Sequence, residues 1–133
     1  MKGIADTGFL VAFANAADAH HAWAVGIAER VTEPLLTCEA VLAETAFHLR
    51  SAALALAMLT EGLVRLDFDA RAHVGSLSFL AARYADRHPD LADLCLIRMS
   101  ELHPRHSVVT TDKADFQIFR RNKREAIPII CPP

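Results

Sequence analysis

Short apolar runs alternate with segments of helical spacing along most of this 133-residue chain. Apolar runs predict strands around Ile4 and over 35–37, 63–68, 107–110 and 127–131. Helical spacing predicts helices over 7–15, 20–31, 39–49, 52–61, 69–84 and 90–102, with a turn over 113–116. Strands that alternate with helices are typical of a parallel sheet with helices on both faces. We therefore expect one domain over residues 1–133, a three-layer α/β/α sandwich with a mostly parallel sheet of about five strands.

Residues that start or end elements refine this outline. Ser51 is predicted to cap the helix over 52–61, and Gly62 to follow it in the left-handed conformation. Pro89 suits the first position of the helix over 90–102. Pro128 cannot donate to a strand ladder, so the last strand is expected at an edge. On the helix that Asp69 caps, four residues are expected to face the core: Val74, Leu77, Leu80 and Ala81.

Composition excludes several classes of protein. The net charge of −2 and the pI near 6.4 argue against a basic protein held to nucleic acid mainly by phosphate contacts. Three cysteines without a Cys-x-x-Cys motif indicate neither a disulfide framework nor a zinc site, and a reducing, cytoplasmic setting fits them. Asp6 interrupts the early apolar run, which argues against a signal peptide. The longest apolar run, 52–59, is too short to span a membrane.

Two of the expected strands end in an acid. Asp6 follows the strand around Ile4, and Asp112 follows the strand over 107–110. Parallel strands with right-handed crossovers bring their carboxyl ends to one edge of the sheet, so these carboxylates are expected at a shared rim, where open α/β sheets place their ligands. A simpler explanation of Asp6 alone is that Asp6 or Thr7 caps the next helix.

Two further acids interrupt apolar helical segments. Glu44 lies more than a turn inside the helix over 39–49, beyond the reach of the helix dipole, and Asp93 precedes the apolar run 94–97. A solvent-facing Glu44 is the simpler alternative, and the helix start alone explains Asp90. Carboxylates about 4 Å apart repel by roughly 4 kcal/mol, so four converging acids require a cation. Oxygen ligands of this kind favour Mg²⁺ or Mn²⁺, which commonly serve phosphoryl chemistry.

Four short patterns in order then resemble the PIN-domain nucleases, and most of all the toxin half of VapBC toxin–antitoxin pairs. They are Ile4-Ala5-Asp6-Thr7, Thr-x-x-x-Val-x-x-Glu over 37–44, Asp-Leu-Ala-Asp over 90–93, and Thr-Thr-Asp-x-x-x-Phe over 110–116. The resemblance covers nearly the whole chain. The apolar segment after Asp93 departs from the alanine-rich run usual there, and Arg98 is unexpected.

This resemblance implies a metal-dependent endoribonuclease. Asp6 and Asp93 would be the principal ligands of Mg²⁺ or Mn²⁺, with Glu44 and Asp112 completing the acidic cluster directly or through water. The supporting residues implied are Thr7, Thr111, Asp90 and Asp115. The ion would activate a water for attack on an RNA phosphodiester, with Glu44 or Asp112 helping to orient or deprotonate that water, and leave a 5′-phosphate.

Partners follow from the same resemblance. A cognate antitoxin is expected to dock in a groove on the early helices, and a homodimer is expected. The early helices carry many apolar residues, which are equally explained as core: Phe9, Phe13, Trp23, Leu54, Met58 and Leu59. The segment 119–124 reads as basic and exposed, and either a solvated loop or an RNA contact explains its four cations: Arg120, Arg121, Lys123 and Arg124.

Three other functions are weaker alternatives. A phosphatase of the haloacid dehalogenase type needs a second acid two positions after its nucleophile, where this chain has Gly8. Metal-independent cleavage by histidines such as His20, His21, His103 and His106 is possible chemistry, but these residues lie at expected helix ends and loops. A catalytically inactive, protein-binding relative is the third alternative, and the presence of all four acids argues against it.

Overall fold

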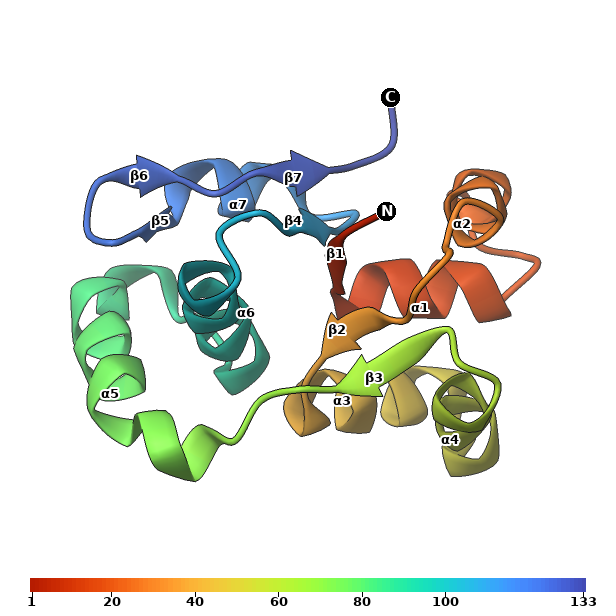
Figure 1. Ribbon diagram of the computed structural model, residues 1–133, viewed down its shortest axis with the longest axis horizontal. Helices are drawn as coiled ribbons and strands as arrows, with labels where there is room; N and C mark the ends of the chain where they lie inside the picture. Colours follow the sequence, from red (N-terminus) through yellow and green to blue (C-terminus); the bar gives the residue numbers. More distant parts are fainter.

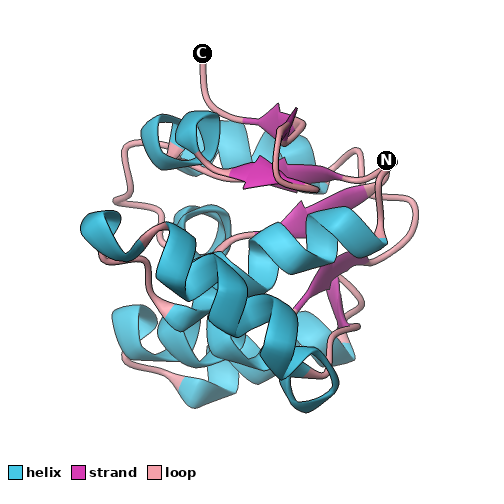
Figure 2. Ribbon diagram, turned by 90° about the vertical axis from the view of Figure 1, so that its left-hand side faces the viewer, coloured by secondary structure: helices cyan, strands magenta, loops and turns pink.

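The computed structural model describes residues 1–133 and has a five-stranded parallel sheet at its centre (Figures 1 and 2). The strand order is β3-β2-β1-β4-β7, and every neighbouring pair is parallel. Its strands are β1 (Gly3–Ala5), β2 (Leu35–Thr37), β3 (Val64–Leu66), β4 (Ser107–Val109) and β7 (Ile129–Ile130). A separate antiparallel pair joins β5 (Arg120–Arg121) to β6 (Glu125–Ala126). The predicted α/β fold is thereby confirmed.

Helices flank the sheet on both sides. They are α1 (Thr7–Ala14), α2 (His21–Ala28), α3 (Glu39–Leu49), α4 (Ala52–Thr60), α5 (Val74–Arg83), α6 (Leu91–Leu102) and α7 (Lys113–Ile118), with 3₁₀ turns η1 (Ala70–His73) and η2 (Ala85–Arg87). The connections from β1 to β2 and β3, which contain α1 to α4, cross the sheet in one direction, and those to β4 and β7, which contain α5 to α7, cross it in the other. Because such connections are right-handed, the two groups of helices lie on opposite faces of the sheet. Figure 1 shows α1 and α6 on opposite sides of β1.

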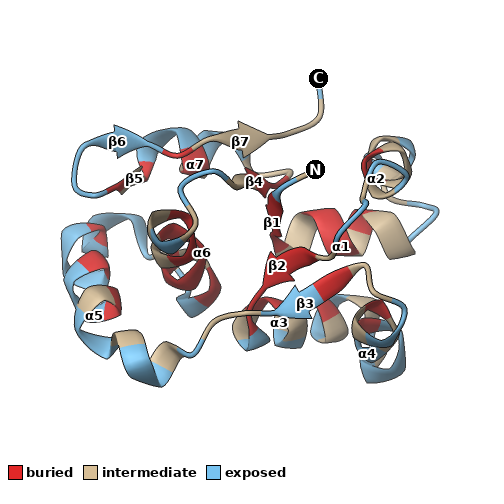
Figure 3. Cartoon of the chain, viewed as in Figure 1, coloured by how far each residue is buried: buried red, intermediate tan, exposed pale blue.

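The sheet supplies the centre of the core. Every residue of β1 and β2 is buried, and helices α1 and α6 add large side chains such as Phe9 and Leu96 (Figure 3). Ile4 of β1 pairs with Leu36 on one side and Val108 on the other. Because these three strands are parallel and in register, the residues that follow them emerge together at one edge of the sheet.

Several local predictions are confirmed. The Ser51 side chain accepts a hydrogen bond from the Leu54 amide (3.1 Å) and so caps α4. Gly62 after that helix has φ +82°, the left-handed conformation expected of it. The strand that follows Pro128 lies at the edge of the sheet. No helix combines the length and the apolar character needed to cross a membrane.

Other local predictions are wrong. Val74 is 57% exposed and Ala81 is exposed, because the only helix packed closely against α5 is α6, which covers the narrow stripe of Leu77 and Leu80. Pro89 lies outside α6, since Asp90 is the N-cap residue. Residues 113–118 form helix α7 and not a turn, and α2 is shorter than expected at both ends.

Candidate functional site

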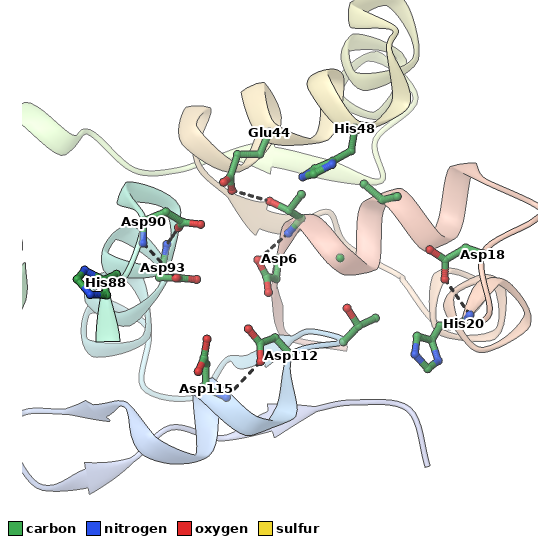
Figure 4. A pocket seen from close by; sticks show the side chains of 14 residues that line it. Asp6, Asp18, His20, Glu44, His48, His88, Asp90, Asp93, Asp112 and Asp115 are labelled. Atoms are coloured by element: carbon green, nitrogen blue, oxygen red, sulfur yellow. Dashed lines mark hydrogen bonds between the residues drawn. The ribbon is translucent and has the colours of Figure 1, made fainter. Parts of the chain in front are cut away.

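A cleft of about 520 Å³ opens at the edge of the sheet where β1, β2 and β4 end (Figure 4). All four acids expected to meet, and all four supporting residues, line it. Its complete lining is Asp6, Thr7, Gly8, Val11, Asp18, His20, Glu44, His48, His88, Asp90, Asp93, Thr111, Asp112 and Asp115. Seven carboxylates, three histidines and no lysine or arginine make this an anionic surface. The scatter of the acids over different faces, which would have contradicted the sequence interpretation, is not observed.

Asp6 lies at the base of the cleft and is only 8% exposed. It is the N-cap of α1, and its Oδ1 accepts a hydrogen bond from the Thr7 amide (2.7 Å). Its Oδ2 accepts one from the Thr110 hydroxyl (2.6 Å), which links β1 to β4 across 104 positions of sequence. The capping explanation of Asp6 is therefore correct, and the same side chain also faces the cleft.

Glu44 reaches the cleft from α3, the helix after β2. The Thr7 hydroxyl donates a hydrogen bond to Glu44 Oε1 (3.1 Å), so a residue of the first motif orients the acid of the second. In Figure 4 Glu44 points toward the group of Asp6, Asp90 and Asp93. The alternative of a Glu44 that only faces bulk solvent is not what the structure shows.

Asp90 and Asp93 form a reciprocal capping box at the start of α6. The Asp93 amide donates to Asp90 Oδ1 (2.8 Å), and the Asp90 amide donates to Asp93 Oδ2 (3.3 Å). Both carboxylates are thus fixed by backbone groups and still line the cleft. Arg98, the unexpected residue further along α6, points elsewhere, with hydrogen bonds to His73 Nδ1 (3.2 Å) and Glu101 Oε1 (3.1 Å).

Asp112 and Asp115 lie on the opposite wall, at the start of α7. Asp112 is the N-cap and accepts a hydrogen bond from the Asp115 amide (3.2 Å). Asp115 forms an ion pair with Arg87 (3.0 Å). Helices α1, α6 and α7 therefore all begin at the cleft with an aspartate as N-cap, and their partial positive ends offset some of the acidic charge.

Thr110, and not only the expected Thr111, contacts the acidic cluster. The Thr110 hydroxyl is fully buried, donates to Asp6 and accepts from the Asp112 amide (2.9 Å), and so positions two of the four acids. Thr111 lines the cleft beside Gly8, where an added Cβ would approach the Thr111 Oγ1 to 2.1 Å. The strand alternation could have identified Thr110 as the inward-facing hydroxyl.

Burial and mutual repulsion raise the pKa of each of the four acids. Burial raises the pKa of Asp6 to about 6, although the hydrogen bonds from Thr110 and Thr7 act in the opposite direction. Burial, followed by the charges of Asp90 and Asp6, raises the pKa of Asp93 to about 7. Burial is also the main reason that the pKa values of Glu44 and Asp112 are raised. Full ionisation of the metal-free cluster therefore lowers the stability of the folded protein.

This cost predicts that the metal-free protein is more stable at pH 5.5 than at pH 8. The pKa of Asp6 is higher in the folded state than the ordinary aspartate value of 3.8, so the stabilising contribution is complete below pH 3.8 and is lost as pH rises through 6. The full shift corresponds to about 3 kcal/mol between pH 3 and pH 8, of which roughly 1 kcal/mol is lost between pH 5.5 and pH 8. Asp6→Asn should remove this part of the pH dependence in thermal melts recorded in EDTA. A difference between wild type and variant that does not change with pH would contradict this prediction.

The donor set fits a hard divalent cation. All donors from the four acids are carboxylate oxygens, which is the ligand type that Mg²⁺ and Mn²⁺ prefer. No group of three His, Cys, Asp or Glu side chains lies close enough together to enclose an ion. Mg²⁺ usually keeps several waters and binds only one or two carboxylates, so an open arrangement of this kind is compatible with it.

The basic segment 119–124 differs from expectation. Phe119 is buried, and Arg121 is 5% exposed, so the segment is not an exposed loop throughout. Arg121 donates hydrogen bonds to the Ser100 carbonyl (3.1 Å), the Ser100 hydroxyl (3.1 Å) and Glu125 (2.6 Å). These contacts hold the β5–β6 hairpin to α6. Arg121 is thereby removed from the candidate RNA contacts, whereas Lys123 and Arg124 are exposed and Arg120 is half-buried.

Arg121→Ala should destabilise the protein, and Arg124→Ala should not. Loss of the hydrogen bonds to Ser100 and Glu125 is expected to lower the free energy of unfolding by about 2–3 kcal/mol. The exposed Arg124 serves as the matched control, with an expected change within about 0.5 kcal/mol. Urea denaturation of the two variants measures both values. Equal stability of the two variants would contradict the structural role of Arg121.

Three further residues line the cleft that the sequence did not lead us to expect there: Asp18, His48 and His88. His48 could have been found, because it lies four residues after Glu44 and therefore on the same face of α3. The position of Asp18 and His20 depends on how the loop between α1 and α2 folds back, for which no local pattern exists. Of the other histidines noted, His21, His103 and His106 lie outside the cleft.

Comparison with known proteins gave a match to a family model and matches among solved structures. The family model described as PIN domain matches residues 4–123 of the chain. Among solved structures, VapC20 of Mycobacterium tuberculosis, described as a sarcin-ricin loop cleaving toxin, is similar with a TM-score of 0.67 and 23% sequence identity. That match covers 79% of this chain and 85% of VapC20, and at this identity it concerns the fold. No curated protein matches the chain.

Proposed function

Because this chain belongs to the PIN domain family, we propose that it is a metal-dependent endoribonuclease and the toxin of a type II toxin–antitoxin pair. The single observation that carries this proposal is the convergence of Asp6, Glu44, Asp93 and Asp112 in one cleft. The fold shared with VapC20, whose description names it as an RNA-cleaving toxin, supports the same function. A reducing cytoplasm is the proposed compartment, in keeping with three free thiols.

Mg²⁺ or Mn²⁺ is the proposed cofactor, with Asp6 and Asp93 as the principal ligands. Glu44 and Asp112 would complete the site directly or through water. A divalent cation supplies charge neutralisation at the phosphate and makes a nearby water more acidic. The chain's own part is to hold these carboxylates in place through Thr7, Thr110 and the capping box of α6.

Proton transfer falls to the acids beside the attacking water. Glu44, held by Thr7, or Asp112, held by the Asp115 amide, would orient that water and accept its proton. Attack in line with the leaving 3′ oxygen gives a 5′-phosphate and does not use the 2′-hydroxyl as nucleophile. The exposed cations Lys123 and Arg124, together with Arg120, are proposed to contact the RNA backbone outside the cleft.

The decisive experiment compares RNA cleavage in Mg²⁺, Mn²⁺ and EDTA. A hairpin with the sarcin-ricin sequence, the RNA that VapC20 is described as cleaving, and total RNA are suitable substrates. We expect cleavage with either ion, 5′-phosphate products and no cleavage in EDTA. Cleavage that persists in EDTA would favour histidine chemistry, which deserves this test because His20, His48 and His88 line the cleft.

An antitoxin is the proposed protein partner. A groove of about 490 Å³ between α1, α2 and α4 has a mostly apolar lining that includes Phe13, Val31 and Leu54. Leu54 is 49% exposed, whereas Phe9 of the expected docking set is fully buried in the core, and Met58 is buried but still lines the groove. Trp23 packs edge-on against Phe9, with ring centroids 5.9 Å apart.

A homodimer is also proposed, and the exposed Phe47, Leu56 and Leu66 are candidates for its interface.

A further inference from the structure

The cleft raises a charge problem that a metal ion at its base solves only in part. Each nucleotide of an RNA strand brings a negative phosphate, and the cleft offers seven carboxylates and neither lysine nor arginine. The nearby Arg87 is already paired with Asp115 (3.0 Å). Phosphates on either side of the scissile bond therefore need hydrogen-bond donors from other residues.

Besides the Thr111 hydroxyl, three histidines in the lining can donate through a ring N–H: His20, His48 and His88. In Figure 4, His88 lies with Asp90 and Asp93 on one side of Asp6, and His20 and His48 lie on the other. An RNA strand that passes over Asp6 and leads away from Asp90 and Asp93 would therefore run toward His20 and His48. Those two residues come from different elements, the start of α2 and the last turn of α3.

The imidazole rings of His20 and His48 are accessible to a bound RNA strand. Both side chains are exposed, and neither ring makes a hydrogen bond within the protein. By contrast, the neighbouring His21 is already engaged, because its Nδ1 is hydrogen-bonded to the Ala12 carbonyl (2.8 Å). The ring of His48 packs edge-on against Phe47, a contact that uses neither of its nitrogens. An imidazole N–H can donate a hydrogen bond to a phosphate oxygen.

From this arrangement we propose that His20 and His48 donate hydrogen bonds to backbone phosphates of the RNA that flank the scissile bond. The proposal rests on the proposed function, because it names substrate contacts of the same cleft. It assigns these histidines to RNA binding, without a part in proton transfer or in holding the ion. The bound strand then has a defined exit path, across the first turns of α1 toward α2.

The test measures RNA affinity separately from cleavage. Fluorescence anisotropy of a labelled single-stranded oligoribonucleotide is recorded on the Asp6→Asn background with Mg²⁺ present. We expect His20→Ala and His48→Ala each to raise Kd about tenfold, and the double variant to multiply the two effects. His48→Gln keeps a side-chain N–H donor and should recover most of the affinity. His106→Ala is the matched control outside the cleft and should leave Kd unchanged.

Steady-state cleavage and metal binding with otherwise wild-type protein complete the test. The His48→Ala variant should raise KM, leave kcat within about threefold, and leave the Mn²⁺ affinity unchanged. An unchanged Kd in both single variants overturns the proposal. A fall in kcat at constant KM, or a loss of Mn²⁺ affinity, overturns it in favour of proton transfer or metal binding. Wild-type protein that binds RNA but never cleaves it would refute the proposed function, and the Kd values would still decide this inference.

Discussion

Asp93→Asn and Asp6→Asn should each abolish metal-dependent RNA cleavage without loss of the fold. Each substitution removes one negative oxygen donor from the place where the ion is proposed to bind, and kcat/KM is expected to fall by about 10³-fold or more. The Asp6 and Asp93 side chains accept hydrogen bonds from the backbone amides of Thr7 and Asp90, and the side-chain carbonyl oxygen of asparagine can accept the same bonds. The cleavage assay in Mg²⁺ measures this loss directly.

The control for these variants is Asp86→Asn, an exposed aspartate of η2 outside the cleft, which should cleave like wild type. Thermal melts in EDTA at pH 8 should show that neither cleft variant is less stable than wild type, because both relieve repulsion among the acids. Titration with Mn²⁺ should show weakened binding. An Asp93→Asn protein that retains more than a tenth of its activity would remove Asp93 from the metal site.

Thr110→Val should reduce cleavage by about 10²-fold, although Thr110 does not line the cleft. The change deletes the donor to Asp6 Oδ2 and the acceptor for the Asp112 amide, so two acids lose their orientation together. The pKa of Asp6 should rise further, since the Thr110 hydrogen bond lowers it in the native protein. Thr110→Ser retains the hydroxyl and should restore most of the activity.

Thr45→Val provides the matched control for this substitution. Thr45 is equally buried and donates to the Val41 carbonyl (2.8 Å) of its own helix, and its hydroxyl makes no hydrogen bond to the cleft acids. Its replacement should cost little activity. Wild-type kcat/KM in Thr110→Val would mean that the carboxylates keep their positions without the hydroxyl, and the positioning role would have to be abandoned.

Thr110 affects where the carboxylates lie and not which atoms can bind the ion. Thr110 itself offers no charge to an ion, so its effect must act through Asp6 and Asp112. A KM unchanged beside a reduced kcat, with Mn²⁺ affinity only modestly lowered, is the signature of misplaced rather than missing carboxylates.

The sequence by itself determined the order and type of the main elements and the positions of the acids. Alternating apolar runs and helical spacing are local properties, and neighbours along the chain largely decide them. Asp6, Asp90 and Asp112 could be located because each follows a recognisable strand or precedes a recognisable helix. Parallel strands with right-handed crossovers then leave only one edge of the sheet for the acids to meet.

Only the tertiary structure decided which polar residues serve those acids and which cations remain free. The Thr110 hydroxyl meets Asp6 across 104 positions, and Arg121 turns inward to Ser100 across 21. His20 and His48 reach one cleft from separate helices. Such contacts depend on how the helices and strands pack. A buried hydroxyl or guanidinium binds whichever partner the packing provides, because the free-energy cost of leaving it without a hydrogen bond exceeds the conformational preferences of the neighbouring residues.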